Sequence, residues 1–178
     1  TTTLGTGTLN AAGVATFTTS AFQLPVGGNQ AITAVYGGDG NYAASTSPPI
    51  NQTVATDATT TTVTASSANP SVFGQPVTFT ATVTSTAPGS GTPTGTVTFK
   101  DGATILGTGT LNAAGVATYT TSAAQLPIGG SQAITASYAT DGNYAASTST
   151  TFSQSVQKDN TTTVVVSFGN PSVLGQAV

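Results

Sequence analysis

The sequence contains no His, Cys, Arg, Glu, Trp or Met. Its cations are Lys100 and Lys158 alone. Without His or Cys the chain can build neither a His-based triad nor a thiolate nucleophile, and the usual zinc ligands are missing. With two Lys and no Arg, it neutralises too few phosphates to hold nucleic acid. We therefore predict that this chain is not an enzyme and has no nucleic-acid partner.

Charge of either sign is scarce. Only 4% of the 178 residues are charged, whereas about a quarter is usual in a soluble domain. The five acidic residues are Asp39, Asp57, Asp101, Asp141 and Asp159. Hydration of the surface must therefore depend on Thr, Ser, Asn, Gln and the backbone.

Long apolar runs are also missing. No stretch reaches the roughly 18 apolar residues of a membrane-spanning helix, so we expect no membrane insertion in this segment. No signal peptide is recognisable, and the sequence opens inside a repeat, so we expect any export signal to lie upstream. The lack of Cys leaves the redox compartment undetermined.

An internal repeat dominates what is present. Residues 4–24 (LGTGTLNAAGVATFTTSAFQL) recur as residues 106–126 (LGTGTLNAAGVATYTTSAAQL), an offset of 102 residues. Residues 69–75 (NPSVFGQ) recur as residues 170–176 (NPSVLGQ), an offset of 101 residues. A period of about 100 residues is too long for a solenoid unit and fits one small β-sandwich domain.

The phase of the repeat predicts the domain organisation. We expect residues 1–56 to be the C-terminal part of one domain, residues 57–157 to be a complete domain, and residues 158–178 to be the N-terminal part of another. The chain would then be a segment of a longer tandem array.

The complete copy reads as short β-strands. Residues 77–83 alternate apolar residues with Thr, which predicts a strand with Val77, Phe79, Ala81 and Val83 facing the core. Asp101-Gly102 is a strong hairpin signal because both residues tolerate positive φ. Leu126 is expected to close one end of the core. The expected strands are residues 60–66, 77–83, 96–100, 104–111, 116–121, 133–138 and 149–156.

About seven short strands with turn signals every 8–12 residues predict an all-β fold of tandem immunoglobulin-like β-sandwiches. In such a fold the aromatic residues at strand positions are core residues and not a sugar-binding platform. We expect this of Phe17, Tyr36, Tyr119 and Tyr138.

The ordered runs TTTTVTASSANPSVFGQPVTFTATV, TPTGTVTFKDG, GVATYTTS, LPIGGSQAITASY and DGNYAAST add a resemblance. The sequence resembles the bacterial Ig-like repeat families of large surface proteins over the whole chain. The resemblance implies an immunoglobulin-like fold in a tandem, extracellular setting, secreted or attached to the cell surface. It implies no reaction.

One candidate metal site follows from the predicted topology. The loop at residues 141–144 (DGNY) is expected at the N-terminal end of its domain, beside the linker residue Asp57. Asp57, Asp141 and Asn143 would offer oxygen ligands to Ca²⁺ at a domain junction, although Ca²⁺ takes six to eight oxygens. The alternative is an Asx turn with Tyr144 packed over the joint. We expect no other cofactor.

Two sequons and a Thr-rich composition make glycosylation a prediction of the sequence. Asn51 and Asn160 each begin an Asn-X-Thr triplet, which is the acceptor pattern for N-linked glycans. Such triplets also arise by chance in a Thr-rich chain, and Thr is a strand former in its own right.

These features favour a structural, non-catalytic role as part of a stalk, fibre or surface filament. Its partners would be the neighbouring repeats of the same chain. Lateral self-association is a further expectation because the strand edges lack guarding charges. The alternative is an adhesin whose loops contact a glycan or protein.

Overall fold

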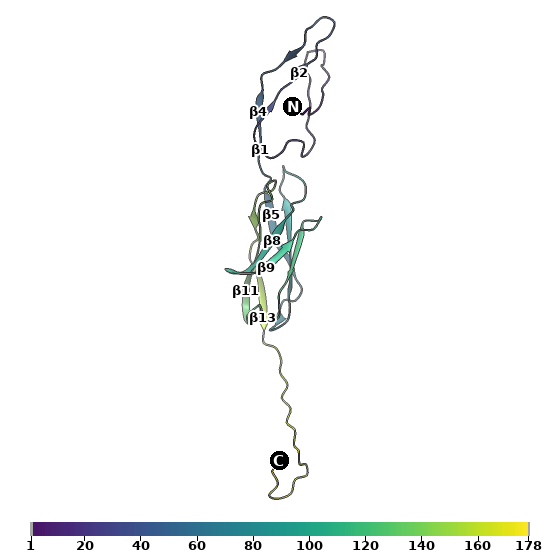
Figure 1. The fold of residues 1–178 in the computed structure, drawn as a ribbon. Helices are drawn as coiled ribbons and strands as arrows, with labels where there is room; N and C mark the ends of the chain where they lie inside the picture. Colours follow the sequence, from purple (N-terminus) through teal and green to yellow (C-terminus); the bar gives the residue numbers. More distant parts are fainter. Residues whose placement is uncertain (1, 178) are drawn as a thin grey trace.

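The computed structural model describes residues 2–177, and these residues form strands and loops without any helix. Nine strands make the central sandwich (Figure 1). They are β5 (Thr59–Ser66), β6 (Ser71–Val72), β7 (Thr78–Ser85), β8 (Thr96–Asp101), β9 (Thr104–Thr110), β10 (Val116–Thr120), β11 (Gly129–Tyr138), β12 (Ser147–Thr148) and β13 (Phe152–Gln157).

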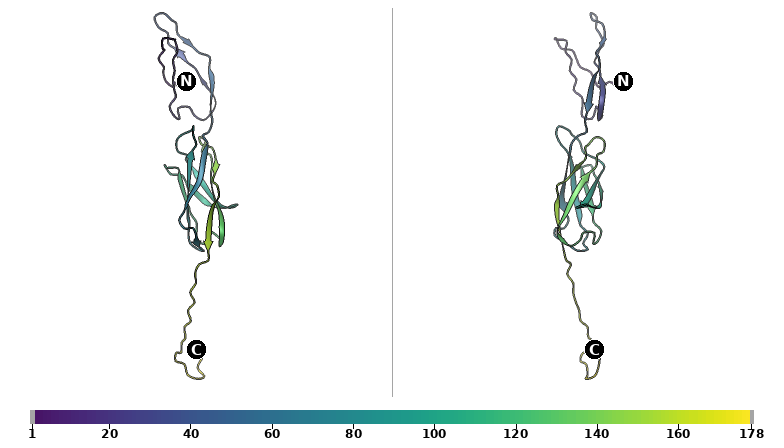
Figure 2. Two further views of the ribbon diagram at one scale, coloured as in Figure 1. Left: turned by 180° about the vertical axis from the view of Figure 1, so that it is seen from behind. Right: turned by 90° about the vertical axis from the view of Figure 1, so that its left-hand side faces the viewer.

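Two sheets face each other in this sandwich (Figure 2). One has the order β10-β7-β5, and the other has the order β6-β13-β11-β8-β9 with β12 paired to β11. All pairs are antiparallel except β6 with β13, which run parallel. This arrangement is an immunoglobulin-like sandwich, as the sequence predicts.

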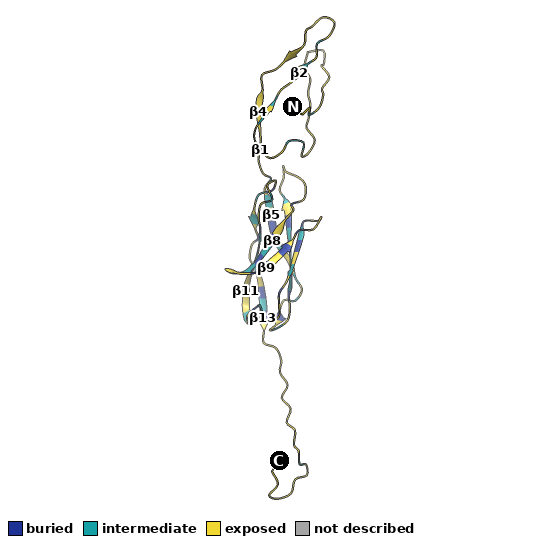
Figure 3. Ribbon diagram, in the orientation of Figure 1, coloured by how far each residue is buried: buried dark blue, intermediate teal, exposed yellow. Residues whose placement is uncertain are grey.

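The alternating residues fill the space between the sheets. Val77, Phe79 and Ala81 are fully buried, and Val83 is 1% exposed, so the inward face predicted for this strand is confirmed. Leu126 is 4% exposed and closes the core as expected. Figure 3 shows the buried residues concentrated in the central sandwich. Burial of this apolar surface is the main stabilising term of the fold.

The first strand changes sheet, which the sequence pattern does not reveal. β5 lies in the three-stranded sheet, and after a short crossing the chain continues as β6 beside β13 of the other sheet. The Asn69 side chain bridges the crossing to β13: its amide donates to the Ser153 carbonyl oxygen at 2.8 Å, and its Oδ1 accepts from the Ser155 N–H at 2.9 Å.

A buried polar side chain fixes the same crossing. Gln154 on β13 is fully buried. Its Nε2 donates to the Ala68 carbonyl oxygen at 2.8 Å, and its Oε1 accepts from the Ser66 hydroxyl at 2.7 Å. Ser71 Oγ lies 3.3 Å from the same Nε2. Because both ends of the amide are bonded, the buried polar group is compensated.

Two strands begin more than two residues away from their predicted starts. β11 begins at Gly129 and not at residue 133, because a bulge between Gly129 and Gln132 lets the strand continue. The strand expected at residues 149–156 begins later, as β13 at Phe152, and the short β12 precedes it at Ser147–Thr148. Between them Ser149 is buried, and its Oγ accepts from the Ala136 N–H at 3.0 Å.

The N-terminal segment repeats the pairing of the sandwich. It contains β1 (Gly27–Ile32), β2 (Val35–Tyr36), β3 (Ser45–Thr46) and β4 (Ile50–Val54). The pair β1–β4 matches Gly27 to Val54, just as β11–β13 matches Gly129 to Val156, 102 residues later. The structural repeat therefore follows the sequence repeat.

The burial expected for the four aromatic residues holds to different degrees. Tyr138 is 2% exposed, Tyr36 and Tyr119 are partly buried, and Phe17 is 47% exposed, so the expectation of a buried Phe17 is wrong. In the central sandwich Tyr119, the counterpart of Phe17, stacks on Phe99 of β8 with ring centroids 6.1 Å apart. Residues 2–56 contain no counterpart of β8, so Phe17 lacks this neighbour.

The chain runs along one direction through the molecule. The N-terminal segment and the central sandwich lie end to end, and the residues after β13 leave from the end opposite the N-terminal segment (Figure 1). The chain thus passes into the sandwich at Asp57 and out at Gln157, at opposite ends. Among the described residues after Gln157 no strand is formed.

Candidate functional site: the joint between the repeats

Asp57 is the first residue of the sandwich to be fixed in place. Its N–H donates to the Asn143 carbonyl oxygen at 2.8 Å, and its carbonyl oxygen accepts from the Ala145 N–H at 2.7 Å. Its carboxylate accepts a hydrogen bond from the Ser85 hydroxyl. A Cβ added at Gly89 would lie 1.8 Å from Asp57 Oδ1, so only glycine leaves room for the carboxylate in this position.

Asp141 organises the loop that receives Asp57. Its Oδ1 accepts from the N–H groups of Asn143 and Tyr144, both at 3.0 Å, which makes an Asx turn. Its Oδ2 accepts from the N–H of Thr94 at 3.1 Å and from the hydroxyl of Thr94 at 2.8 Å. Burial by itself raises the pKa of Asp141, but these four hydrogen bonds outweigh it and lower the pKa to about 2.

Tyr144 lies at the centre of the joint. It is 6% exposed, and its hydroxyl donates to the Ser90 carbonyl oxygen at 2.9 Å. Burial, followed by the negative charges of Asp57 and Asp141, raises the pKa of the Tyr144 hydroxyl above its usual value. The two carboxylates therefore act on a common neighbour.

Tyr138 and its counterpart Tyr36 use their hydroxyls differently. Tyr36 donates to Asp39 Oδ2 at 2.9 Å. In the sandwich the corresponding oxygen of Asp141 accepts from Thr94, and the buried Tyr138 hydroxyl has no hydrogen-bond partner among the described residues. Burial, and then the charge of Asp141, raises the pKa of Tyr138 to about 12.

The three candidate calcium ligands are brought to one end of the sandwich. Asp57 and Asn143 are joined through their backbones, and Asp141 closes the turn that contains Asn143. The carboxylates already accept hydrogen bonds from Ser85 and Thr94. No group of three or more acidic, His or Cys side chains gathers within residues 2–177. The arrangement contains the Asx turn of the alternative interpretation, and calcium binding stays a prediction.

Both sequon asparagines are exposed. Asn51 lies on β4, where it pairs with Ala31 of β1. Asn160 follows β13, and its N–H donates to Asp159 Oδ1 at 2.8 Å. Exposure meets one requirement of glycan attachment, and the modification itself remains a prediction.

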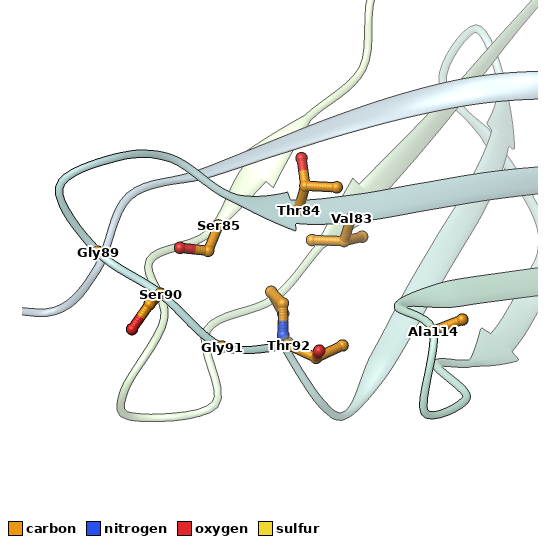
Figure 4. A pocket seen from close by; sticks show the side chains of 9 residues that line it. Val83, Thr84, Ser85, Gly89, Ser90, Gly91, Thr92 and Ala114 are labelled. Carbon is orange, nitrogen blue, oxygen red and sulfur yellow. The ribbon is translucent and has the colours of Figure 1, made fainter. Parts of the chain in front are cut away.

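A shallow recess lies beside the joint (Figure 4). It holds about 260 Å³ and is lined by Val83, Thr84, Ser85, Gly89, Ser90, Gly91, Thr92, Pro93 and Ala114. A second recess of about 420 Å³ is lined by residues 55–58 and 86–89. The first has no charged side chain in its lining, so it offers neither a general base nor a charged anchor for a ligand.

Sequence reasoning missed the loop between β7 and β8. Its letters, TSTAPGSGT, look like an unspecific spacer. In the structure it supplies Gly89 to the Asp57 carboxylate and the Ser90 carbonyl oxygen to Tyr144. The signal that could have found it is the pair of glycines, Gly89 and Gly91, at alternate positions in one loop, because glycine marks close approach.

Within residues 2–177 there is no helix long and apolar enough to cross a membrane. A search among curated proteins found no match. A family model described as a bacterial Ig-like domain (group 3) matches residues 1–55 and again residues 58–157. The two matches adjoin on either side of Asp57, and together they cover well over half of the chain. The chain therefore belongs to the bacterial Ig-like domain family, group 3.

Proposed function

We propose that this chain is a structural, non-catalytic segment of an extracellular stalk or fibre, in which each repeat acts as a rigid spacer. The observation that carries the proposal is the path of the chain, which joins two copies end to end and leaves the sandwich at the end opposite Asp57 (Figure 1). Each further copy therefore adds length. A spacer needs length and stiffness and no unique chemical group.

The division of the chain follows from the same reasoning. We assign residues 1–56 and 57–157 to successive domains and residues 158–178 to the start of the next. Asp57 supports this boundary because its backbone is already hydrogen-bonded to the loop at residues 143–145. Asp159, near the start of residues 158–178, is the counterpart of Asp57 in the sequence repeat.

The chemistry of the surface is consistent with this role. The described residues at the joint are bonded to one another and not directed at an open ligand site. Family membership adds a setting, since bacterial Ig-like domains commonly occur in surface proteins. The proposed location is therefore outside the cell, secreted or attached to its surface.

Lateral association would turn single stalks into fibres. The strands at the sheet edges, β5, β6, β9 and β10, carry no charged residue, and so none of the lysines that usually guard an edge. Hydroxyls of Thr59 and Thr61 bond to Ser147, which covers part of the β5 edge. At the other side of the two sheets, Gln125 Nε2 donates to the Leu106 carbonyl oxygen of β9 at 2.8 Å. We propose the edge formed by β9 and β10 for association.

Deletion of one repeat tests the spacer role. Removing residues 57–158 in frame from the parent protein keeps the phase, because Thr56 is then followed by Asp159. Electron microscopy of producing cells, with an antibody against a distal part of the protein, measures the stand-off from the surface. We expect it to shorten by roughly 40 Å, from ten-residue β11 at about 3.3 Å per residue plus turns.

The adhesin alternative predicts a different result. If the repeat grips a glycan or protein, attachment of the cells to that target falls after the deletion even when the distal part is displayed at an unchanged distance. A stand-off that does not change would contradict the spacer role.

A further inference from the structure

One aromatic residue of the N-terminal segment occupies an unusual position. Phe22 has φ of 62°, in the left-handed region that is unfavourable for large side chains. It is 71% exposed, so core packing does not explain it. Its counterpart in the second copy is Ala124, with φ of 60°. The conformation is thus kept while the side chain changes.

The turn around Phe22 is a rigid platform. The Ser20 N–H donates to Gln23 Oε1 at 3.0 Å, and Gln23 Nε2 donates to the Leu4 carbonyl oxygen. The second copy repeats both bonds, with Ser122 N–H donating to Gln125 Oε1 at 3.0 Å. Because Gln23 holds the turn on both sides, the direction in which residue 22 projects is fixed.

Phe22 projects to the following repeat. A Cβ added at Gly91 would lie 2.7 Å from Phe22 Cζ and 2.2 Å from the Tyr144 hydroxyl oxygen, so the phenyl tip packs on bare backbone beside Tyr144. Gly91 itself has φ of 95°, which favours glycine. It lies in the loop between β7 and β8, next to Ser90, which accepts the Tyr144 hydroxyl bond (Figure 4).

The linker beside this contact is short. β4 ends at Val54, and Asp57 is already hydrogen-bonded to the sandwich, so Ala55 and Thr56 alone are free of strand or bridge pairing. A joint held by one short linker can still bend about it. A second point of contact, from Phe22 to Gly91, restricts that bending.

We propose that Phe22 docks on the Gly91–Tyr144 surface of the following repeat and stiffens that joint, and that a repeat with Ala124 at this position forms a looser joint. The stiffness of the array is then set joint by joint by the residue at one left-handed turn position. This inference rests on the proposed spacer function, which makes the neighbouring repeat the natural partner of this surface.

Spin-label distances in the intact chain test the proposal directly. The absence of Cys means that two introduced cysteines, Thr8→Cys and Thr110→Cys, are the sole labelling sites. Both positions are exposed and lie one period apart, on either side of the joint. Double electron–electron resonance then reports the width of the distance distribution between the two repeats.

Phe22→Ala is the decisive variant, because it installs the residue that the second copy already accepts in this turn. We expect its distance distribution to be at least twice as wide as that of the unmodified joint. Ala124→Phe is the matched control, since it adds a phenyl group at the far end of the sandwich, and it should leave the distribution unchanged.

Thermal unfolding of each variant separates joint loosening from loss of fold. An unchanged distance distribution in Phe22→Ala, with an unchanged melting temperature, would overturn the proposal. A distribution that widens equally in Ala124→Phe would overturn it as well. Neither result bears on the spacer function, which is measured by stand-off and not by joint width.

Discussion

The side-chain amide of Gln154 donates a 2.8 Å hydrogen bond to the carbonyl oxygen of Ala68, which lies 86 residues earlier in the chain. The bond joins the last strand of the sandwich to the crossing between β5 and β6. The Gln154 side chain is fully buried, so its amide depends on partners within the protein.

We therefore expect replacement of the Gln154 amide to cause a large loss of stability. Gln154→Ala removes the amide that bonds to the Ala68 carbonyl oxygen and to the Ser66 hydroxyl, and it opens a cavity at a fully buried position. The Ser66 hydroxyl keeps the Ala68 carbonyl oxygen as a partner at 3.1 Å. We expect the free energy of unfolding to fall by about 2–4 kcal/mol. Urea unfolding followed by circular dichroism measures it. Gln157→Ala, at an exposed position on the same strand, should change it by less than about 0.5 kcal/mol.

The hydroxyls of Tyr138 and Tyr144 should contribute differently to the free energy of unfolding. Tyr138→Phe removes a buried hydroxyl that has no hydrogen-bond partner within residues 2–177, so we expect stability to stay within about 0.5 kcal/mol or to rise. Tyr144→Phe removes the hydrogen bond to the Ser90 carbonyl oxygen and should cost about 0.5–1.5 kcal/mol. The same unfolding assay compares the pair, and equal losses in both would contradict the hydrogen-bond assignment.

The pH dependence of stability should be flat in the middle and steep at both ends. There is no His, and standard Asp, Lys and Tyr pKa values lie outside pH 5–9. The folded-state pKa of Asp141, about 2, is below its ordinary value of 3.8, so its stabilising contribution is complete above pH 4 and is lost as pH falls toward 2.

Tyr138 acts in the opposite direction at high pH. Its folded-state pKa of about 12 is above the ordinary value of 10.0, so its contribution to stability is present below pH 10 and is lost as pH rises toward 12. Melting temperatures from pH 2 to 12 test both limbs. Asp141→Asn should flatten the acid limb. A large change between pH 5 and 9 would count against this account.

If chains associate through the β9–β10 edge, the size of the particles in solution should depend on protein concentration. Sedimentation velocity of the parent repeat protein should show larger species as concentration rises. Thr118→Lys places a charge at an exposed position of β10, and we expect it to suppress these species. Thr62→Lys, at an exposed position of β5, serves as the control. Monomers at every concentration would contradict the proposal of lateral association.

How far the sequence predicts the structure depends on whether a residue acts through periodicity or through a distant partner. Val77, Phe79 and Val97 are recognisable from alternation alone, and all are fully buried. Asp101-Gly102 predicts the hairpin between β8 and β9, and Gly102 has the positive φ, 54°, that the turn requires. These signals are local, so one copy of the sequence is enough to read them.

The remaining features depend on contacts far along the chain. Gln154 looks like a surface residue by type, and its burial follows from Ala68 and Ser66 on another strand. Gly89 is conspicuous only once the Asp57 carboxylate is known to lie against it. The role of Phe22 depends on a neighbouring repeat, which no local pattern can describe.

The parallel pairing of β6 with β13 has a consequence under tension. Ser71 and Val72 pair with Val156 and Gln157, and the Phe73 N–H donates to the Gln157 carbonyl oxygen at 2.8 Å. A force applied to the two ends of the sandwich shears β13 along β6. The hydrogen bonds between the two strands then bear the force together and do not break one after another. The same short strand that completes the fold would then act as a latch against stretching.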